Sequence, residues 1–352
     1  MIKVLIVDDS ASVRLLLTEF FLREPDFDVV GCAEDGESAI RMVRQLNPDV
    51  VTMDVNLPDY DGFTVTRRIM EQNPVPIVII SAVYTASDAE VGFRLLDTGA
   101  LAFHNKPAIN DEFFNESMAE IVMSVRSMSE VKLVRRKAKP GGYVAPSRSS
   151  SNNSYGFSPG NGHVNAEIVC IGASTGGPQA LKQVLMSLPQ NLPVPVVVVQ
   201  HISTGFLEGL VNWLYNSTGH NIQIANDGEV LKAGTVYFAP EDQNIEISSK
   251  LKVILTNSPA VNGIRPTVAG MFDSVARNIG SGVVGVLLTG MGSDGAEGLL
   301  EIRRRCGYTI AQDKETSIIF GMPGEAVKIG AAIAILPLGE IADAIVQHTI
   351  GQ

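Results

Sequence analysis

A serine bracketed by glycines follows a short apolar run near the middle of the chain. The stretch Ile168 to Gln183 reads IVCIGASTGGPQALKQ, and Ser174 stands where the apolar residues end. Pro178 fits the first turn of a helix, and a helix start offers free N–H groups to a developing negative charge. GASTG also matches the G-x-S-x-G pattern of a serine at a strand-to-helix turn. Ser174 is therefore a candidate nucleophile for attack on an acyl carbon.

The same turn has two other interpretations. Ser174 could serve only as a helix cap, and a strand followed by a glycine-rich turn and a helix also describes a phosphate-binding loop. The stretch is not G-x-G-x-x-G, however, and it has no Walker lysine. A nucleotide site is the weaker interpretation.

A serine nucleophile needs a base, and a histidine follows the next apolar run. His201 comes directly after PVPVVVVQ, so in a parallel sheet it is expected at the same edge as Ser174. A core histidine bonded to the backbone is the alternative. Asp294, in VVGVLLTGMGSDG, is preferred as the group that orients the imidazole because glycines surround it, while Asp313 remains a competitor. The order Ser, His, Asp differs from that of the α/β-hydrolases.

A second set of reactive side chains lies in the first part of the chain. From residue 1 to about 125, short apolar strands alternate with helical patterns, which predicts a doubly wound, five-stranded (flavodoxin-like) domain. The polar residues at the strand ends are Asp8, Asp9, Asp54, Ser81 and Lys106. Such groups meet in one crevice, where three carboxylates would repel one another unless a hard cation such as Mg²⁺ joined them. Asp54 is the candidate phosphoryl acceptor, although each residue alone could be a loop or cap residue.

This first part resembles a response-regulator receiver domain over its whole length. The matching pieces are Asp8-Asp9, the segment MDVNLPDYDG around Asp54, Ser81-Ala82 and Lys106-Pro107. The resemblance implies that a histidine kinase phosphorylates Asp54, that Ser81 and Lys106 take part in the phosphoryl switch, and that the Mg²⁺ ligands are Asp8, Asp9, Asp54 and the backbone of Asn56. Tyr84 and His104 lie where such domains switch, or they only pack.

Beyond about residue 125 the chain changes character twice. Residues 126 to 165 are first basic and then rich in Ser, Asn and Gly, which predicts a solvated linker that includes His163. No recognition helix accompanies the basic stretch, so nucleic acid is not expected as a partner. Residues 166 to 352 predict a second doubly wound, mostly parallel α/β domain, with an antiparallel portion between Gln223 and Leu255.

The second domain, with the receiver ahead of it, resembles the catalytic domain of the chemotaxis protein-glutamate methylesterases, the CheB family. The pieces that carry the resemblance are IGASTGGP, Gln200-His201, TGMGSDGAEGL and TIAQDKETSIIFGMP. It implies phosphorylation-activated hydrolysis of γ-glutamyl methyl esters on the signalling helices of chemoreceptors, with deamidation of glutamines as a related activity. The implied triad is Ser174, His201 and Asp294. Thr175 would shape the site, the Met291 N–H would serve as an oxyanion donor, and the ester chemistry would need no metal.

Three places depart from the family pattern. Family members usually have HMPPGF where this chain has His201 to Phe206, a histidine in place of Gly263 or Ile264 before the RPS-like tract, and an aspartate in place of Ala269. The triad residues are unaffected. The choice of receptor helix is the property that these changes put in question.

Composition limits the remaining possibilities. A net charge of −11 argues against general binding to nucleic acid or anionic membranes. The three cysteines are far apart in the sequence, and the N-terminus has no signal-peptide pattern, so a cytoplasmic protein is expected that meets the membrane only through receptors. Two rival functions remain: a phospho-dependent binding module without turnover, and a DNA-binding response regulator.

Overall fold

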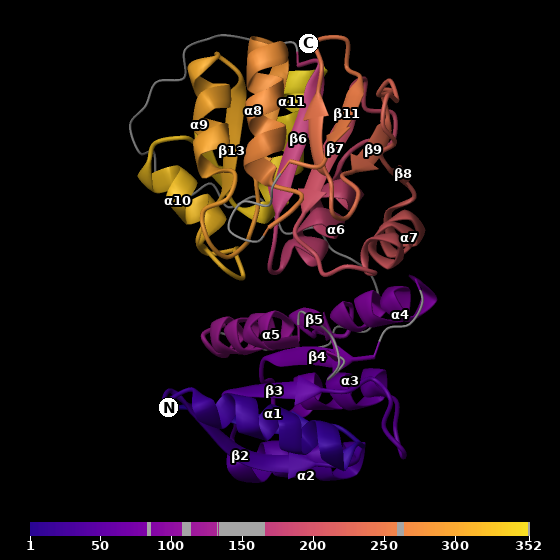
Figure 1. Ribbon diagram of the computed structural model, residues 1–352, viewed down its shortest axis with the longest axis vertical. Coiled ribbons are helices and arrows are strands. Elements are labelled where there is room, and N and C mark those ends of the chain that lie inside the picture. The colour runs from indigo at the N-terminus through magenta and orange to yellow at the C-terminus, as the bar shows by residue number, and fades with distance from the viewer. Residues whose placement is uncertain (83–85, 108–113, 132, 134–165, 259–263, 351–352) are drawn as a thin grey trace.

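The computed structural model describes residues 1–82, 86–107, 114–131, 133, 166–258 and 264–350 (Figure 1). Tyr84, His163 and Gly263, which the sequence analysis mentions, lie outside these residues. So does most of the predicted linker, and the domain boundaries at residues 125 and 165 therefore stay a prediction.

The first domain is a five-stranded parallel sheet with the strand order β2-β1-β3-β4-β5. Its strands are β1 (Ile2–Val7), β2 (Phe27–Ala33), β3 (Val50–Met53), β4 (Ile77–Ser81) and β5 (Ala102–Asn105). Its helices are α1 (Ala11–Arg23), α2 (Gly36–Leu46), α3 (Gly62–Gln72), α4 (Ala86–Leu96) and α5 (Phe114–Ser129). β3 and β4 are buried along their whole length, as central strands with helices on both faces must be. The predicted doubly wound fold is confirmed.

The second domain contains a seven-stranded parallel sheet with the order β14-β13-β12-β6-β7-β9-β8. Its strands are β6 (Ile168–Ala173), β7 (Val196–Gln200), β8 (Asn221–Ile224), β9 (Thr235–Phe238), β12 (Val283–Leu287), β13 (Tyr308–Gln312) and β14 (Ala334–Leu336). The helices are α6 (Gly177–Ser187), α7 (Leu207–Thr218), α8 (Val268–Asn278), α9 (Ala296–Arg304), α10 (Met322–Lys328) and α11 (Leu338–Thr349), with a 3₁₀ turn at Gly280–Gly282. The predicted α/β class is confirmed.

The antiparallel portion is smaller than the sequence suggested. It consists of β10 (Asn244–Ile247) and β11 (Val253–Thr256), which pair only with each other. β8 and β9 looked like parts of a hairpin, but they pair in parallel as the last two strands of the main sheet. β8 and β9 join the main sheet because β9, whose four residues are all buried, pairs in parallel with β7 on one side and β8 on the other.

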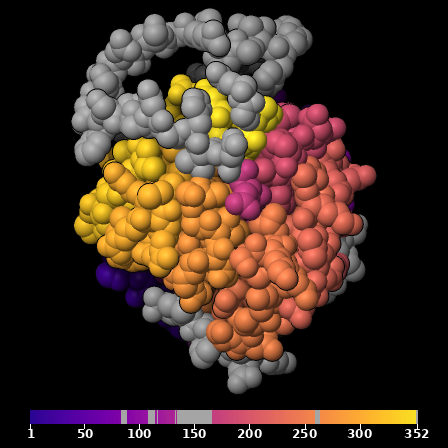
Figure 2. Space-filling view, turned by 90° about the horizontal axis from the view of Figure 1, so that it is seen from above, coloured from indigo at the N-terminus to yellow at the C-terminus, as the bar shows by residue number. Residues whose placement is uncertain are grey.

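The two domains are stacked along the long axis of the molecule, and seen from the far end the second domain hides most of the first (Figure 2). In Figure 1, α4, β5 and α5 form the side of the receiver that faces α6 and α7. One buried hydrophobic cluster continues across the boundary, from Phe93 of α4 to Phe206 and Trp213 of the second domain. Among the helices of the described residues, none combines the length and the apolar character needed to cross a bilayer.

Candidate active site and phosphorylation site

Ser174 lies in a tight turn between β6 and α6. Its N–H donates to Thr289 O at 3.1 Å, and its own carbonyl accepts from the N–H of Gly177 at 2.7 Å. Gly176 has a φ of +78°, which a residue with a side chain rarely adopts. α6 starts after Gly176, and no side chain caps it. The cap interpretation of Ser174 therefore finds no support, and the helix N-terminus opens beside the serine.

His201 and Asp294 lie together at the carboxyl ends of β7 and β12. The His201 N–H donates to Ala173 O at 2.9 Å, which holds the histidine beside the end of the nucleophile strand. Its Nε2 lies 2.8 Å from Oδ2 of Asp294. This contact leaves Nδ1 as the ring nitrogen that Asp294 does not engage. Among the described contacts, no hydrogen bond joins the Ser174 hydroxyl to His201.

Asp294 is held by the start of helix α8 as well as by the histidine. The N–H groups of Val268 and Ala269 donate to its two oxygens at 2.7 and 3.0 Å. Burial alone would raise the pKa of Asp294, but the hydrogen bond and charge of His201 together with these two N–H groups outweigh it and lower the pKa. Because Ala269 contributes its backbone, the missing aspartate side chain at this position leaves this support in place.

Asp313, the competing carboxylate, does different work. Its Oδ1 accepts from the N–H of Thr316 at 2.9 Å and from the Thr316 hydroxyl at 2.6 Å, which closes the turn after β13. Within the described residues it makes no contact with His201. The geometry therefore favours Asp294 as the partner of the imidazole.

The loop after β12 lies against the nucleophile. A Cβ on Gly290 would fall 2.7 Å from the Cβ of Ser174, so only glycine allows this approach. The Thr289 hydroxyl donates to the carbonyl of Thr175 at 3.0 Å and ties the two loops together. In the part of the chain that the structure describes, neither the Thr175 N–H nor the Met291 N–H donates a hydrogen bond. Free N–H groups beside a nucleophile are what an oxyanion site needs.

Sequence reasoning missed the role of Gln200. This side chain is 4% exposed, and its Nε2 donates to the carbonyls of Ser174 at 2.9 Å and His201 at 2.7 Å. A Cβ on Gly177 would lie 2.0 Å from its Oε1, so the turn leaves room for the amide only because residue 177 is glycine. One amide thus ties the backbone of Ser174 to that of His201. A polar residue that ends an otherwise apolar strand, next to the histidine, was the available signal.

A second residue without a sequence-based role holds the segment after the base. The Glu241 carboxylate accepts from the N–H groups of Gly205 and Leu207, at 2.8 to 3.0 Å. It thereby caps α7, which has no cap of its own. The departure from the family pattern at Ile202 to Thr204 falls inside this restrained segment.

The polar strand ends of the receiver also meet. Lys106 Nζ lies 2.7 Å from Oδ2 of both Asp8 and Asp54, and Asp54 Oδ1 accepts from the N–H of Val55 at 2.7 Å. Asp8, Asp9 and Asp54 bring oxygen atoms within 4.8 Å of one another, which is close enough to share a divalent cation. Burial, and then the charge of Asp54, raise the pKa of Asp8 in spite of Lys106. The two carboxylates raise the pKa of Lys106 against the effect of its burial.

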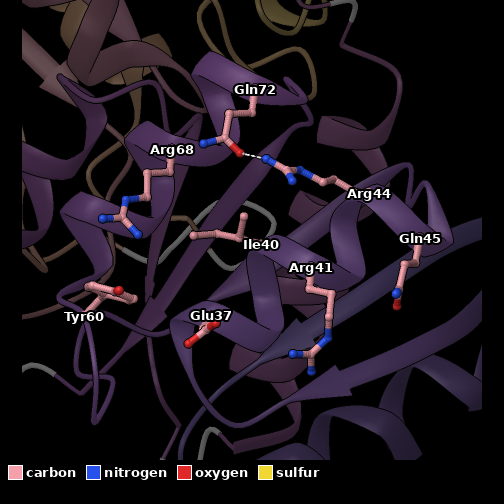
Figure 3. A pocket seen from close by; sticks show the side chains of 8 residues that line it. All are labelled: Glu37, Ile40, Arg41, Arg44, Gln45, Tyr60, Arg68 and Gln72. Carbon is pink, nitrogen blue, oxygen red and sulfur yellow. Dashed lines mark hydrogen bonds between the residues drawn. The ribbon is translucent and has the colours of Figure 1, made fainter.

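The remaining described receiver residues that the sequence analysis singled out are not members of this cluster of charges. Ser81 is buried at the end of β4, and Asn56 is exposed in the loop after Asp54. His104 is half-buried on β5, and its surroundings lower its pKa to about 4. A groove of about 500 Å³ between α2 and α3, lined by Arg41, Arg44 and Arg68 among others, contains no residue of either site (Figure 3).

Fold and sites together define a receiver domain joined to an α/β domain with a hydrolase-type serine, histidine and aspartate. Residues 4–116 match the response regulator receiver domain, and residues 169–345 match the CheB methylesterase model. The chain belongs to the CheB methylesterase family.

Individual relatives cover nearly the whole chain. The protein-glutamate methylesterase/protein-glutamine glutaminase 2 of Methanospirillum hungatei is 43% identical over 97% of each chain. A Syntrophus aciditrophicus protein, protein-glutamate methylesterase/protein-glutamine glutaminase 1, is 44% identical over 99% of this chain and 98% of its own. The crystal structure of the Thermotoga maritima CheB methylesterase catalytic domain aligns with a TM-score of 0.50 and 38% identity, and it covers 52% of this chain and 99% of that domain.

Proposed function

We propose that this chain hydrolyses γ-methyl esters of glutamate residues on the signalling helices of chemoreceptors and releases methanol, with deamidation of glutamines at the same site. The observation that carries the proposal is the 2.8 Å contact between His201 and Asp294 beside the Ser174 turn. The relatives named as methylesterase/glutaminase, at 43 and 44% identity, supply the substrate class. A binding module without turnover has no need of such a pair, and beyond the receiver the chain matches the CheB methylesterase model over residues 169–345.

The residues divide the work as follows. His201 Nδ1 takes the proton of Ser174 while Oγ bonds to the ester carbon, and the N–H groups of Thr175 and Met291 stabilise the oxyanion. The carbon–oxygen bond to the methoxy group then breaks, and His201 returns the proton to methanol. Water attacks the acyl-enzyme with His201 as base, which frees glutamate and Ser174. Asp294 stabilises the imidazolium in both steps.

The receiver accepts a phosphoryl group on Asp54 from a histidine kinase. Asp8, Asp9, Asp54 and the Asn56 carbonyl offer hard oxygen ligands, which fit Mg²⁺, and a bound Mg²⁺ would neutralise the phosphoryl oxygens. Lys106 already lies between Asp8 and Asp54 and can follow the new charge, while Ser81 offers a hydroxyl at the neighbouring strand end. Asp54→Asn should abolish labelling by acetyl phosphate, and wild type should be labelled only with Mg²⁺ present. Acid-stable labelling that survives Asp54→Asn contradicts this assignment.

Before phosphorylation, the receiver restrains the catalytic domain by direct contact. Ile318 and Ile319 pack against the receiver's cluster around α1 and α5, and Ile318 also lies over the nucleophile turn, 2.9 Å from where a Cβ on Gly176 would be. The receiver therefore contacts a wall of the active site. We place the protein in the cytoplasm, where it would reach the membrane only through its receptors.

Incubation with membranes that contain methyl-labelled receptors tests the proposal. Wild type activated by acetyl phosphate should release labelled methanol, and Ser174→Ala should not. Ser187→Ala is the matched control, because this exposed serine ends the same helix and bonds only within it. Release that persists in Ser174→Ala, or no release by wild type, contradicts the proposed function.

A further inference from the structure

The groove between α2 and α3 of the receiver has the opposite charge from the chain as a whole. The complete chain has 38 acidic and 27 basic residues. Three arginines line the groove, Arg41 and Arg44 of α2 and Arg68 of α3, against a single carboxylate, that of Glu37 (Figure 3). We call this site of about 500 Å³ the α2–α3 groove. Its local excess of positive charge favours an anion.

The positive charges of the three arginines are not neutralised within the protein. Among the described residues, ion pairs with carboxylates are made by other arginines, and none is made by Arg41, Arg44 or Arg68. Arg44 donates to the side-chain oxygen of Gln72, which is a neutral group. Arg41 and Arg44 are three residues apart and therefore lie on the same side of α2. Guanidinium groups in such a position can hold phosphate oxygens with paired N–H donors.

The α2–α3 groove also has an apolar, flat part. Figure 3 shows Ile40 in the middle of the polar side chains, and both Ile40 and Tyr60 are partly buried against the hydrophobic core. The guanidinium carbon of Arg68 lies 4.4 Å from the centroid of the Tyr60 ring. Aromatic rings and guanidinium planes are surfaces on which nucleobases stack. At the rim, Glu37 offers an acceptor and Gln45 an amide for the edge of a base.

The aromatic ring is held against α2 without any ligand. Asp59, next to Tyr60, accepts from the N–H groups of Gly36 and Glu37 at 2.8 and 2.9 Å. A Cβ on Gly36 would lie 2.5 Å from the side chain of Val65 and 3.3 Å from the Cβ of Tyr60, so the loop packs closely on the start of α2. A site whose parts are already in place loses less conformational entropy when it binds a ligand.

We propose that the α2–α3 groove binds a nucleoside polyphosphate, with the phosphates between Arg41 and Arg44 and the base against Tyr60 and Arg68. A volume of about 500 Å³ is within the range of small-molecule sites, whereas a protein partner buries a larger surface. Inorganic phosphate would leave Ile40 and the Tyr60 ring unused. The proposed binding goes beyond the esterase function and does not depend on it.

Isothermal titration calorimetry of the full chain with ATP and with GTP tests the proposal. Mg²⁺ is left out, so that the carboxylates around Asp54 repel a polyphosphate from the phosphorylation site. Saturable binding of at least one of these nucleotides is expected, and tripolyphosphate should bind about tenfold more weakly because it has no base to stack. Absence of saturable nucleotide binding overturns the proposal. Tripolyphosphate that binds as tightly as the nucleotides, or an oligoglutamate peptide that binds more tightly, shows a different ligand class and also overturns it.

Arginine variants locate the binding. Arg41→Gln and Arg44→Gln should each weaken nucleotide binding about tenfold, because each removes a charged hydrogen-bond donor. Arg67→Gln is the matched control, since this exposed arginine precedes Arg68 on α3 and does not line the groove. It should bind the nucleotide as wild type does. Equal weakening in all three variants would mean that only the overall charge matters, and unchanged affinity in both α2 variants would place the ligand elsewhere; either result overturns the proposal.

Tyr60→Leu tests the part of the site assigned to the base. It should weaken nucleotide binding about tenfold and leave tripolyphosphate binding unchanged, so that the two ligands bind with similar affinity. Unchanged nucleotide affinity in a folded Tyr60→Leu protein contradicts the assigned position of the base. If this variant does not fold, the comparison of nucleotide with tripolyphosphate in wild type still decides whether a base contributes.

Discussion

Asp8 directly follows the buried strand β1, Asp294 lies in the loop after the buried strand β12, and the pKa values of the two carboxyls move in opposite directions. Asp294 receives hydrogen bonds from His201 and from two N–H groups at the start of α8, so its pKa is lowered in spite of burial. Asp8 has Lys106 and the N–H of Ser10, but burial and the neighbouring charge of Asp54 raise its pKa.

The difference shows which of the two carboxylates already has all its stabilising partners within the protein. The donors around Asp294 come from the protein itself, so this carboxylate has its hydrogen-bond partners without any ligand. The receiver places two buried carboxylates around one lysine, and this excess of negative charge leaves a role for a cation and a phosphoryl group. The site around Asp294 thus keeps one geometry, whereas the site around Asp8 and Asp54 can respond to a change of charge.

The largest expected effect tests the site around Asp294. Ser174→Ala or His201→Ala should lower kcat by several orders of magnitude, approaching about 10⁶ by analogy with a serine protease. Asp294→Asn should cost less, about 10⁴, because the base stays but its orientation and charge support are lost. Steady-state rates of methanol release measure both.

Asp313→Asn is the matched carboxylate control. It should loosen the turn at Thr316 and leave kcat nearly unchanged, because the side chain bonds only within its own turn. If Asp313→Asn cripples the enzyme and Asp294→Asn does not, then Asp313, and not Asp294, is the carboxylate that supports His201.

A smaller effect is expected from the residue that joins nucleophile to base. Gln200→Met has a similar volume and no donors, so kcat should fall about 100-fold with little change in KM, because a modest misplacement of reacting groups has that cost. Asn278→Leu is a suitable control, since Asn278 also donates to a carbonyl, that of Ile247, but lies at the far end of α8. If both variants lose stability and activity equally, Gln200 is only structural.

Removal of the receiver should have a smaller effect still. A fragment that begins near Asn165 should hydrolyse receptor esters about tenfold faster than the unphosphorylated full chain, within the usual range of coupling between domains. Phosphorylated full chain should match or exceed the fragment. Equal rates for all three forms would mean that the receiver serves chiefly for localisation or kinase docking.

The sequence predicted those features that follow from strand periodicity. Polar residues at strand ends, such as Asp54 and Lys106, were expected in one crevice because all strands of a parallel sheet end at one edge. The choice between Asp294 and Asp313 could not be settled in this way, because both follow strands. What distinguishes them is the start of α8, which lies more than twenty residues earlier in the chain and donates only to Asp294.

Side-chain direction and short elements escaped prediction. Gln200 looked like the end of a strand, and only the packing of β7 against the Ser174 turn gives its amide two carbonyls to bind. Helix α10 was missed because its seven residues are too few for a periodic pattern and contain Pro323 and Gly324. β9 also pairs in parallel with β7, which lies far from it in the sequence. No local sequence pattern could therefore predict the parallel pairing of β8 with β9.

The smallest expected effect concerns Asp8, whose pKa in the folded protein lies above its ordinary value of 3.8. A carboxyl with a raised pKa makes folding less favourable once it is ionised, so the cost appears as the pH rises above 3.8 and is complete above the pKa of the folded state. Asp8→Asn should therefore raise the Tm of the receiver at pH 7 without Mg²⁺, by on the order of a few degrees. The gain should vanish as the pH falls below 3.8, because wild type then carries the proton in both the folded and the unfolded state. Mg²⁺ should stabilise wild type more than the variant, because a ligand that binds only the folded state stabilises it. Thermal unfolding of the full chain, followed with and without Mg²⁺ across this pH range, measures all three effects. A lower Tm for Asp8→Asn at pH 7 would show that the ion pair with Lys106 outweighs burial, and Asp8 would then be as well supported as Asp294.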